Sequence, residues 1–294
     1  MIVRLQQFKP LASRCISIRH SSTSTSLINI RSIPAPHSGS IRVLSLNNPQ
    51  TRNAISRALL TELASHINEI YTEGPQGSTR AVILASDIDT SFCAGADLKE
   101  RRGFTLEETK NFLTTLRGTF KAISQMPIPT ITALSSVALG GGLELALTTH
   151  LRVFASTSIV GLPETRLAII PGAGGTYRLP AVIGQTRAMD LMLTGRRVQG
   201  PEAYFLGICD RLVEVTPEET KIVGAVRTKV LDAAIQLARD ICEGGPGALR
   251  AVISAAGQGE DAENQAYETV IGMKDRDEAL VAFQEKRKPV FKGV

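Results

Sequence analysis

The sequence of 294 residues is poor in the features that build disulfide frameworks, metal centres and membrane spans. Its four cysteines lie far apart and form no CxxC pair, which argues against a disulfide framework and against a zinc site. Its four histidines also lack the spacing of metal ligands. No apolar run reaches about eighteen residues, so no transmembrane helix is expected. With 43% hydrophobic residues and no long polar tract, the chain is expected to be globular.

Acidic residues are missing from the first part of the chain, where the first one is Glu62. Residues 1–32 hold five basic residues and the hydroxyl-rich run Ser21–Ser26. Arginines spaced among Leu, Ile and Phe without any acid are typical of a mitochondrial transit peptide. We therefore predict that residues 1–32 are a transit peptide and that the mature protein works in the mitochondrial matrix. The alternative is a disordered tail without a targeting role.

The net charge of +5 is explained by this same segment. Without its five basic residues, the chain holds 28 basic and 28 acidic residues. Global charge therefore gives no case for nucleic-acid binding.

Strand and helix patterns alternate through the first two-thirds of the chain and then become helical only, which predicts an α/β fold with a helical C-terminal part. The strands are expected at residues 41–47, 80–85, 129–137, 151–155 and 211–215. The helices are expected after Ser56, at 107–125 and at 142–149. A helix and a short helix are expected between residues 176 and 211, and the pattern is helical from 217 to the end, with breaks at 244–246, 257–259 and 272.

The most informative stretch is residues 138–144, Ala-Leu-Gly-Gly-Gly-Leu-Glu, where a predicted strand gives way to a predicted helix. Glycine allows close approach of a ligand to the backbone, and the first N–H groups of a helix lack internal partners. Backbone donors at Gly140 to Gly142 are thus placed for an oxyanion, and Glu144 adds a general acid or base beside them. The alternative is a helix that starts with glycines and exposes an ordinary glutamate.

Two further segments carry candidate chemistry. Residues 92–97, Phe-Cys-Ala-Gly-Ala-Asp, follow a buried strand, and their small side chains would let a backbone N–H face a ligand. Pro163 fixes the backbone before Glu164, and a second glycine-rich turn follows at residues 171–176. Taken alone, each segment is better explained by an ordinary loop or a surface glutamate.

The three segments together resemble the enoyl-CoA hydratase/isomerase (crotonase) family, and they occur in the family's order. The resemblance runs from about residue 41 to residue 294. It implies a ββα spiral core over residues 33–225 and a helical C-terminal trimerisation region over 226–294. It also implies a homotrimer or a dimer of trimers.

The resemblance implies a role for each residue of the centre. The N–H groups of Ala96 and Gly141 would form an oxyanion hole for the thioester oxygen. Glu144 would activate water, and Glu164 would protonate the α-carbon. Family isomerases typically work with one carboxylate, at the position of Glu164, so the pair favours a hydratase. No cofactor or metal is implied, because coenzyme A is part of the substrate.

The resemblance also implies contacts with coenzyme A, some of them from the terminal helix of a neighbouring subunit. The residues expected to bind substrate or coenzyme A are Arg52, Ala54, Ala94, Asp97, Leu98, Lys99, Gly140, Gly172, Phe283 and Lys286. Two positions depart from the family pattern: Ser136 stands where glycine is usual, and His150 stands where aspartate is usual. We interpret His150 as a structural histidine.

Within the family, the motifs are most similar to mitochondrial methylglutaconyl-CoA hydratases, which predicts 3-methylglutaconyl-CoA as the substrate. General short-chain enoyl-CoA hydratases of fatty-acid oxidation share most of the pattern and remain the alternative. The sequence does not reveal a cationic group for a charged acyl tail. RNA binding is a second class of function, since some family members bind RNA. The basic residues of 99–121 are interrupted by acids and lack interleaved aromatics, so a solvated mixed-charge face is preferred.

Overall fold

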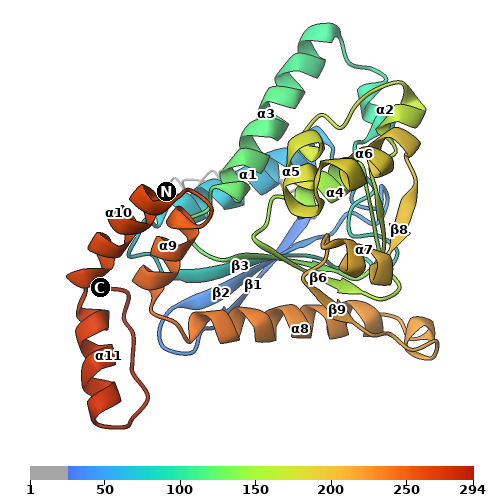
Figure 1. Ribbon diagram of the computed structural model, residues 1–294. Coiled ribbons are helices and arrows are strands. Elements are labelled where there is room, and N and C mark those ends of the chain that lie inside the picture. The colour runs from blue at the N-terminus through green and yellow to red at the C-terminus, as the bar shows by residue number, and fades with distance from the viewer. Residues whose placement is uncertain (1–25) are drawn as a thin grey trace, which may run out of the picture.

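The computed structural model describes residues 26–294, and it shows two sheets with helices around them (Figure 1). The larger sheet has six strands in the order β1-β2-β3-β4-β6-β9, and the smaller one has the order β5-β7-β8. In the larger sheet β1 pairs antiparallel with β2, and every following pair is parallel. The strands are β1 Ile28–Pro34, β2 Ser40–Leu46, β3 Thr79–Ser86, β4 Thr130–Leu134, β5 Val137–Leu139, β6 Leu151–Ala155, β7 Ile159–Gly161, β8 Arg197–Gln199 and β9 Arg211–Val213.

The helices cover both faces of the larger sheet. Helix α8 lies along one face, and α1, α3 and α4 lie on the other side (Figure 1). The helices are α1 Arg57–Thr72, α2 Leu98–Arg101, α3 Leu106–Ser124, α4 Gly141–Ala146, α5 Gly175–Ile183, α6 Gln185–Thr194, α7 Gly200–Leu206, α8 Ala225–Cys242, α9 Pro246–Ala255, α10 Glu260–Ile271 and α11 Lys274–Gln284. None of the described helices is long and apolar enough to cross a membrane.

The pleat of the parallel strands divides the core into two clusters. Val43, Ile83 and Val153 face α8, while Leu44 and Leu84 face α1 and α3. Successive side chains of a strand point to opposite faces, so strands buried on both faces are hydrophobic throughout. The apolar stripe of α1 packs in the cluster that contains Leu44 and Leu84. Ser56 caps this helix by accepting a hydrogen bond from the N–H of Leu59.

Strand β1 was missed by the sequence patterns, and the predicted boundary between residues 32 and 33 falls inside it. Ile28 is buried, and it pairs with Leu46 of β2. The carboxylate of Glu62 accepts hydrogen bonds from the N–H groups of Leu27 and Ile28, both at 3.0 Å. The folded sheet therefore includes residues assigned to the transit peptide. The remainder of that prediction, residues 1–25, lies outside the described residues.

The strand expected at residues 129–137 is two strands in different sheets. Strand β4 ends at Leu134, and β5 begins at Val137 in the smaller sheet. The chain changes sheet at Ser135 and Ser136, and apolar pattern alone does not mark such a change. The chain thus enters the smaller sheet directly before α4 begins at Gly141.

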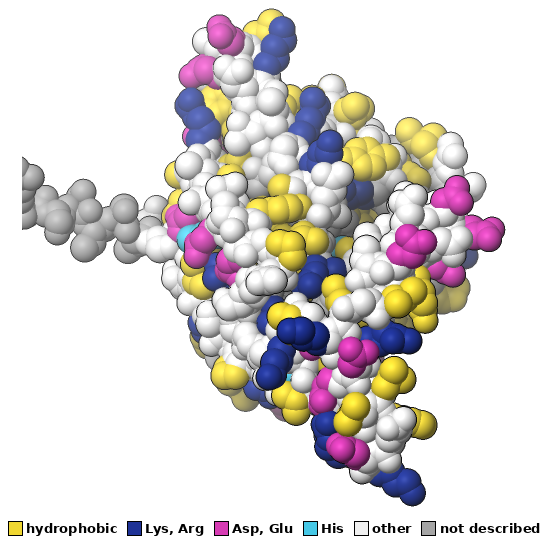
Figure 2. Space-filling view, turned by 90° about the vertical axis from the view of Figure 1, so that its left-hand side faces the viewer, with side chains coloured by type: hydrophobic (Ala, Val, Ile, Leu, Met, Phe, Trp, Pro, Cys, Tyr) yellow, Lys and Arg dark blue, Asp and Glu magenta, His cyan; other side chains and the backbone are white. Residues whose placement is uncertain are grey.

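The C-terminal part has two different roles in the structure. Helix α8 belongs to the core, because its residues Val230, Ala234 and Leu237 pack against the larger sheet. Helices α10 and α11 extend from the body at the end of the chain (Figure 1). These helices expose apolar side chains, including Tyr267 and Phe283. Figure 2 shows hydrophobic, basic and acidic side chains interspersed over the face that these helices present.

Candidate active site

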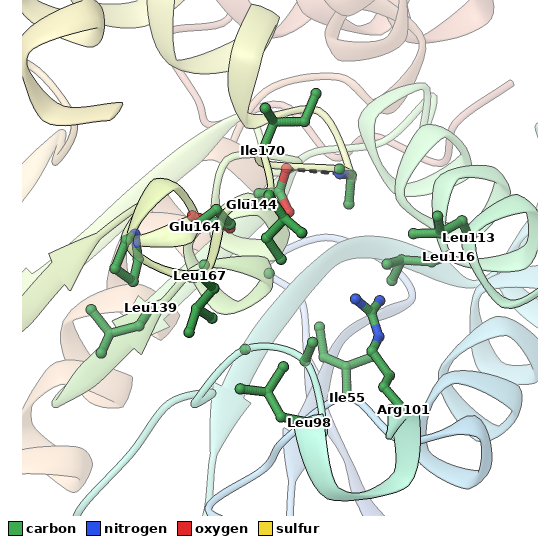
Figure 3. A pocket seen from close by; sticks show the side chains of 18 of the residues that line it. Ile55, Leu98, Arg101, Leu113, Leu116, Leu139, Glu144, Glu164, Leu167 and Ile170 are labelled. Carbon is green, nitrogen blue, oxygen red and sulfur yellow. Dashed lines mark hydrogen bonds between the residues drawn. The ribbon is translucent and has the colours of Figure 1, made fainter. Parts of the chain in front are cut away.

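A cavity of about 620 Å³ lies between α2, α3, the start of α4 and the segment 163–173. Both candidate carboxylates, Glu144 and Glu164, line it, together with the backbone of Ala96 and Gly141. Figure 3 shows the two glutamates close together on one wall, with the apolar side chains of α3 across the cavity from them. Three segments far apart in the sequence therefore meet at one site.

The N–H groups of Ala96 and Gly141 are both available to a ligand. Neither has an acceptor among the turn and loop hydrogen bonds of the described residues. Gly141 is the first residue of α4, so its N–H lacks an intrahelical partner. The loop carrying Ala96 is held by two backbone bonds, from Ile55 N–H to Gly95 O at 2.7 Å and from Asp97 N–H to Ile55 O at 3.3 Å. These bonds leave the N–H of Ala96 unused.

Two glycines permit this loop to approach α4 closely. A β-carbon on Gly142 would lie 2.1 Å from the carbonyl oxygen of Cys93, and one on Gly95 would lie 2.6 Å from that of Leu139. Gly95 also has a φ of +98°, which side-chain-bearing residues rarely adopt. The glycines that the sequence places on both segments are therefore required for the two N–H groups to share one cavity.

Glu144 is held in a fixed position by the second glycine-rich turn. Its Oε1 atom accepts hydrogen bonds of 2.8 Å from the N–H groups of Ala173 and Gly175. Burial raises the pKa of Glu144, while these two hydrogen bonds and the charges of Arg178 and Arg101 act in the opposite direction. One carboxylate oxygen is thus occupied by backbone donors, and the other remains for a proton.

Glu164 lies in a less polar environment at the start of a 3₁₀ turn, Glu164–Leu167. Its Oε2 atom is buried and has no hydrogen-bond partner in the described part of the chain. Burial raises the pKa of Glu164 to about 7, and the charge of Glu144 adds to this effect. Two carboxyl groups in one cavity with different hydrogen-bond environments are suited to separate acid and base roles.

The structure brings eight of the predicted site residues to this cavity: Ala94, Ala96, Leu98, Gly140, Gly141, Glu144, Glu164 and Gly172. The others lie outside its lining. Asp97 caps α2, with its Oδ1 accepting from the N–H groups of Lys99 and Glu100 at 3.1 Å. Lys99 is exposed, and Ala54 is buried without reaching the cavity.

The remaining predicted contacts are farther along the chain. Arg52 has a φ of +56°, and its carbonyl oxygen accepts from the N–H of Ala94, so its backbone shapes the loop next to the cavity. Phe283 is 84% exposed at the end of α11, and Lys286 follows that helix with a φ of +55°. Neither lines the cavity of its own chain. Their predicted role through a neighbouring subunit stays a prediction.

Several residues of the cavity were missed at the sequence level. Ala173 and Gly175 position Glu144, and the glycine-rich turn at 171–176 was the available signal. Arg101 also lines the cavity, and its position three residues after Leu98 places it on the same face of α2. No cluster of three or more His, Cys, Asp or Glu that could hold a metal ion occurs among residues 26–294.

The two departures from the family pattern lie away from the cavity lining. His150 is partly buried, and its Nδ1 accepts from the N–H of Thr130 at 3.1 Å. Burial and the charge of Arg152 lower the pKa of His150, so a neutral imidazole is favoured. Ser136 has a buried Oγ atom without a hydrogen-bond partner among the described residues. The contacts of His150 agree with a structural histidine.

Comparison with known proteins places this geometry in a family context. The model of the enoyl-CoA hydratase/isomerase family matches residues 37–294. An enoyl-CoA isomerase/hydratase of Zymoseptoria tritici is 60% identical over 93% of this chain and 90% of its own length. Methylglutaconyl-CoA hydratase 1, mitochondrial, of Pyricularia oryzae is 53% identical over 91% of this chain and 87% of its own length.

The solved structures give the same picture. A crystal structure of an enoyl-CoA hydratase from Bacillus anthracis is 40% identical and superimposes with a TM-score of 0.82. It covers 92% of this chain and 100% of its own. The fold expected from the sequence motifs, a crotonase-type α/β core followed by helices, is thereby confirmed.

Proposed function

The chain belongs to the enoyl-CoA hydratase/isomerase family, and from this premise we propose that it adds water to the double bond of 3-methylglutaconyl-CoA, a step of leucine degradation. The observation that carries the proposal is the presence of two buried carboxylates, Glu144 and Glu164, on one cavity with two unused N–H groups. The choice of substrate is supported by the methylglutaconyl-CoA hydratase of Pyricularia oryzae at 53% identity.

The reaction begins with the thioester oxygen between the N–H groups of Ala96 and Gly141. Attack of water on the β-carbon moves electrons toward this oxygen and creates an enolate. Preorganised donors stabilise such a charge in a site from which water is largely excluded, by about 3 to 4 kcal/mol each. The two N–H groups therefore lower the barrier, because they interact more strongly with the enolate than with the neutral thioester.

The two glutamates divide the proton transfers between them. Glu144 accepts a proton from water through the oxygen that Ala173 and Gly175 leave unoccupied, and the oxygen of that water bonds to the β-carbon. Glu164 donates its proton to the α-carbon. The raised pKa of Glu164, about 7, supports this role, since a carboxylic acid must hold its proton near neutral pH to donate it. One proton is taken and one is given, so the addition is balanced.

Hydration rates of the purified protein on 3-methylglutaconyl-CoA and crotonyl-CoA test the proposal directly. The proposal expects the larger kcat/KM for 3-methylglutaconyl-CoA. A larger value for crotonyl-CoA would instead assign a general short-chain hydratase of fatty-acid oxidation. Absence of activity on both thioesters would contradict hydration of either substrate.

We also propose a trimer or a dimer of trimers in the mitochondrial matrix. Exposed apolar residues of α10 and α11, such as Phe283 and Leu280, support association with other copies. The Pyricularia and human methylglutaconyl-CoA hydratases, named mitochondrial, support the location. Sedimentation that gave a monomer, or import assays that left the protein outside mitochondria, would contradict these proposals.

RNA binding is less well supported. Acidic residues stand among the basic ones on this surface: Glu100 of α2 and Glu108 of α3 both form ion pairs with Arg57 of α1. Figure 2 shows acidic and basic side chains mixed at the tip of the molecule and on its C-terminal part. Binding of RNA that weakened steeply with salt would revive this alternative.

A further inference from the structure

The side chain of Arg101 brings a cation into an otherwise largely apolar part of the cavity. Arg101 is the last residue of α2, and Asp97 caps that helix at its other end. Figure 3 shows its guanidinium directed into the cavity from α2, between Leu113 and Leu116 on one side and Leu98 on the other. The surrounding side chains could hold an acyl chain without this cation, so its presence calls for an explanation.

The guanidinium of Arg101 makes no side-chain hydrogen bond or ion pair with any residue of 26–294. Its Nε atom is buried without a partner, and the group lies 4.7 Å above the ring of Phe112. The other arginines nearby are engaged. Arg117 donates from Nε to the carbonyl oxygen of Gly172 at 2.7 Å, and Arg178 donates to that of Ala173 at 2.7 Å. Arg101 is thus distinguished by unused donors.

Unused donors on a half-buried cation cost free energy in the empty cavity. Burial lowers the pKa of Arg101, while the charges of Glu144 and Glu100 raise it, and an arginine stays protonated in either case. Its planar fork matches a carboxylate, and a charge-assisted bidentate pair is stronger than a neutral hydrogen bond. An anion entering the cavity would therefore find a prepared partner.

We propose that Arg101 binds a carboxylate at the far end of the acyl chain and selects thioesters of dicarboxylic acids. This inference rests on the proposed function, which puts the thioester oxygen at Ala96 and Gly141. In 3-methylglutaconyl-CoA the free carboxylate lies two bonds beyond the β-carbon that faces Glu144. Arg101 and Glu144 line the same cavity, and the guanidinium is directed into it across from the wall that carries Glu144 (Figure 3).

The same contact predicts discrimination against neutral acyl chains. A crotonyl group would leave the donors of Arg101 unpaired and further shielded from water. Sites built to bind a polar group reject analogues that lack it, because the buried partner is left unsatisfied. A carboxylate bound without Arg101 would in turn be repelled by Glu144.

Binding of two saturated thioesters tests the proposal without relying on hydration. Titration calorimetry would compare glutaryl-CoA, which carries the distal carboxylate, with butyryl-CoA, which does not. We expect Arg101→Gln to weaken glutaryl-CoA about tenfold to a hundredfold and to leave butyryl-CoA unchanged or tighter. Arg102→Gln is the matched control, since Arg102 is exposed, directly follows α2 and lies outside the cavity lining. It should behave as the wild type.

Steady-state kinetics would show whether Arg101 binds the distal carboxylate of the substrate or acts only through its effect on Glu144. In Arg101→Gln, kcat/KM should fall more for 3-methylglutaconyl-CoA than for crotonyl-CoA, on which a loss reports only the missing charge near Glu144. An equal loss on both substrates, or unchanged binding of glutaryl-CoA, would overturn the proposal. Arg101→Lys keeps the charge without the fork and should give an intermediate value; it also serves as the second variant if the glutamine variant folds poorly. A wild-type protein that discriminates in binding but hydrates neither substrate would count against the proposed function and not against Arg101.

Discussion

The carboxylate of Glu164 lies directly against the backbone of Gly140. A β-carbon built on Gly140 would be 3.0 Å from the Oε1 atom of Glu164, and Gly140 has a φ of +53°. The residue that precedes α4 is therefore small for two reasons, its conformation and the space that the second carboxylate occupies. This contact links the strand-to-helix turn of residues 138–144 to a glutamate twenty residues later.

Replacement of Gly140 by alanine is expected to lower kcat at least tenfold, because the new methyl group displaces Glu164. The strained backbone conformation should also cost about 1 to 3 kcal/mol of stability. Steady-state kinetics and thermal unfolding would measure both effects. Gly118→Ala is the matched control, since a β-carbon there meets nothing within 4 Å on α3 and alanine favours a helix. Normal activity in Gly140→Ala would contradict the role of this contact.

We expect each of the variants Glu144→Gln and Glu164→Gln to slow hydration by a factor of about 10² to 10⁴. This factor is the usual contribution of a positioned acid or base to the rate. Both side chains remain nearly isosteric, so far-UV circular dichroism should be unchanged. Single-turnover rates on crotonyl-CoA would provide the measurement. Near-normal turnover in both variants would show that the mechanism is wrong.

The pH dependence of kcat/KM should report the protonation of Glu164. If the acid form of Glu164 is required, activity falls as pH rises through about 7, where this group loses its proton. On the acidic side, activity falls as Glu144 becomes protonated, and its raised pKa brings this limb closer to neutrality than for an exposed glutamate. The profile of Glu164→Gln should lack the basic limb. A basic limb that persists in this variant would assign it to another group.

The stability of the protein should depend on pH through the same group. Because the pKa of Glu164 is raised from 4.5 to about 7 in the folded state, the folded protein binds more protons than the unfolded chain between these values. The free energy of unfolding contributed by Glu164 therefore falls as pH rises through this window.

Glu164→Gln removes that dependence, because glutamine carries no charge to bury. We expect the melting temperature of the variant to exceed that of the wild type at pH 8.5 and the difference to shrink at pH 5. Differential scanning fluorimetry at the two pH values is sufficient. A constant difference at both values would mean that Glu164 does not titrate in this range.

Truncation at the N-terminus should show whether β1 contributes to the stability of the folded protein. A chain that starts at Ser26 keeps β1 and its bonds to Glu62, and it should be as stable as the full chain. A chain that starts at Ile33 loses the buried Ile28 and most of β1, and it should unfold at lower denaturant concentration. Equal urea midpoints for the two chains would show that β1 contributes little.

The order and type of most elements were readable from the sequence, because they depend on local periodicity and on capping residues. The strand at residues 151–155 and the helix capped by Ser56 have the expected positions. The breaks near Gly244, Gly257 and Gly272 separate the last four helices as expected. Strand β1 was missed because most of it was assigned to the transit peptide, although its isoleucines alternate with polar residues as in a half-buried strand.

The sequence by itself determined the chemical groups of the site: a pair of glutamates, glycines before a helix, and small residues after a strand. Local motifs carry this information, since each group needs only its own segment. Only the tertiary structure decided which groups share a cavity. The N–H groups of Ala173 and Gly175 hold Glu144, and Arg101 reaches the cavity from α2 with unused donors. These relationships join segments tens of residues apart, and packing between elements decides them.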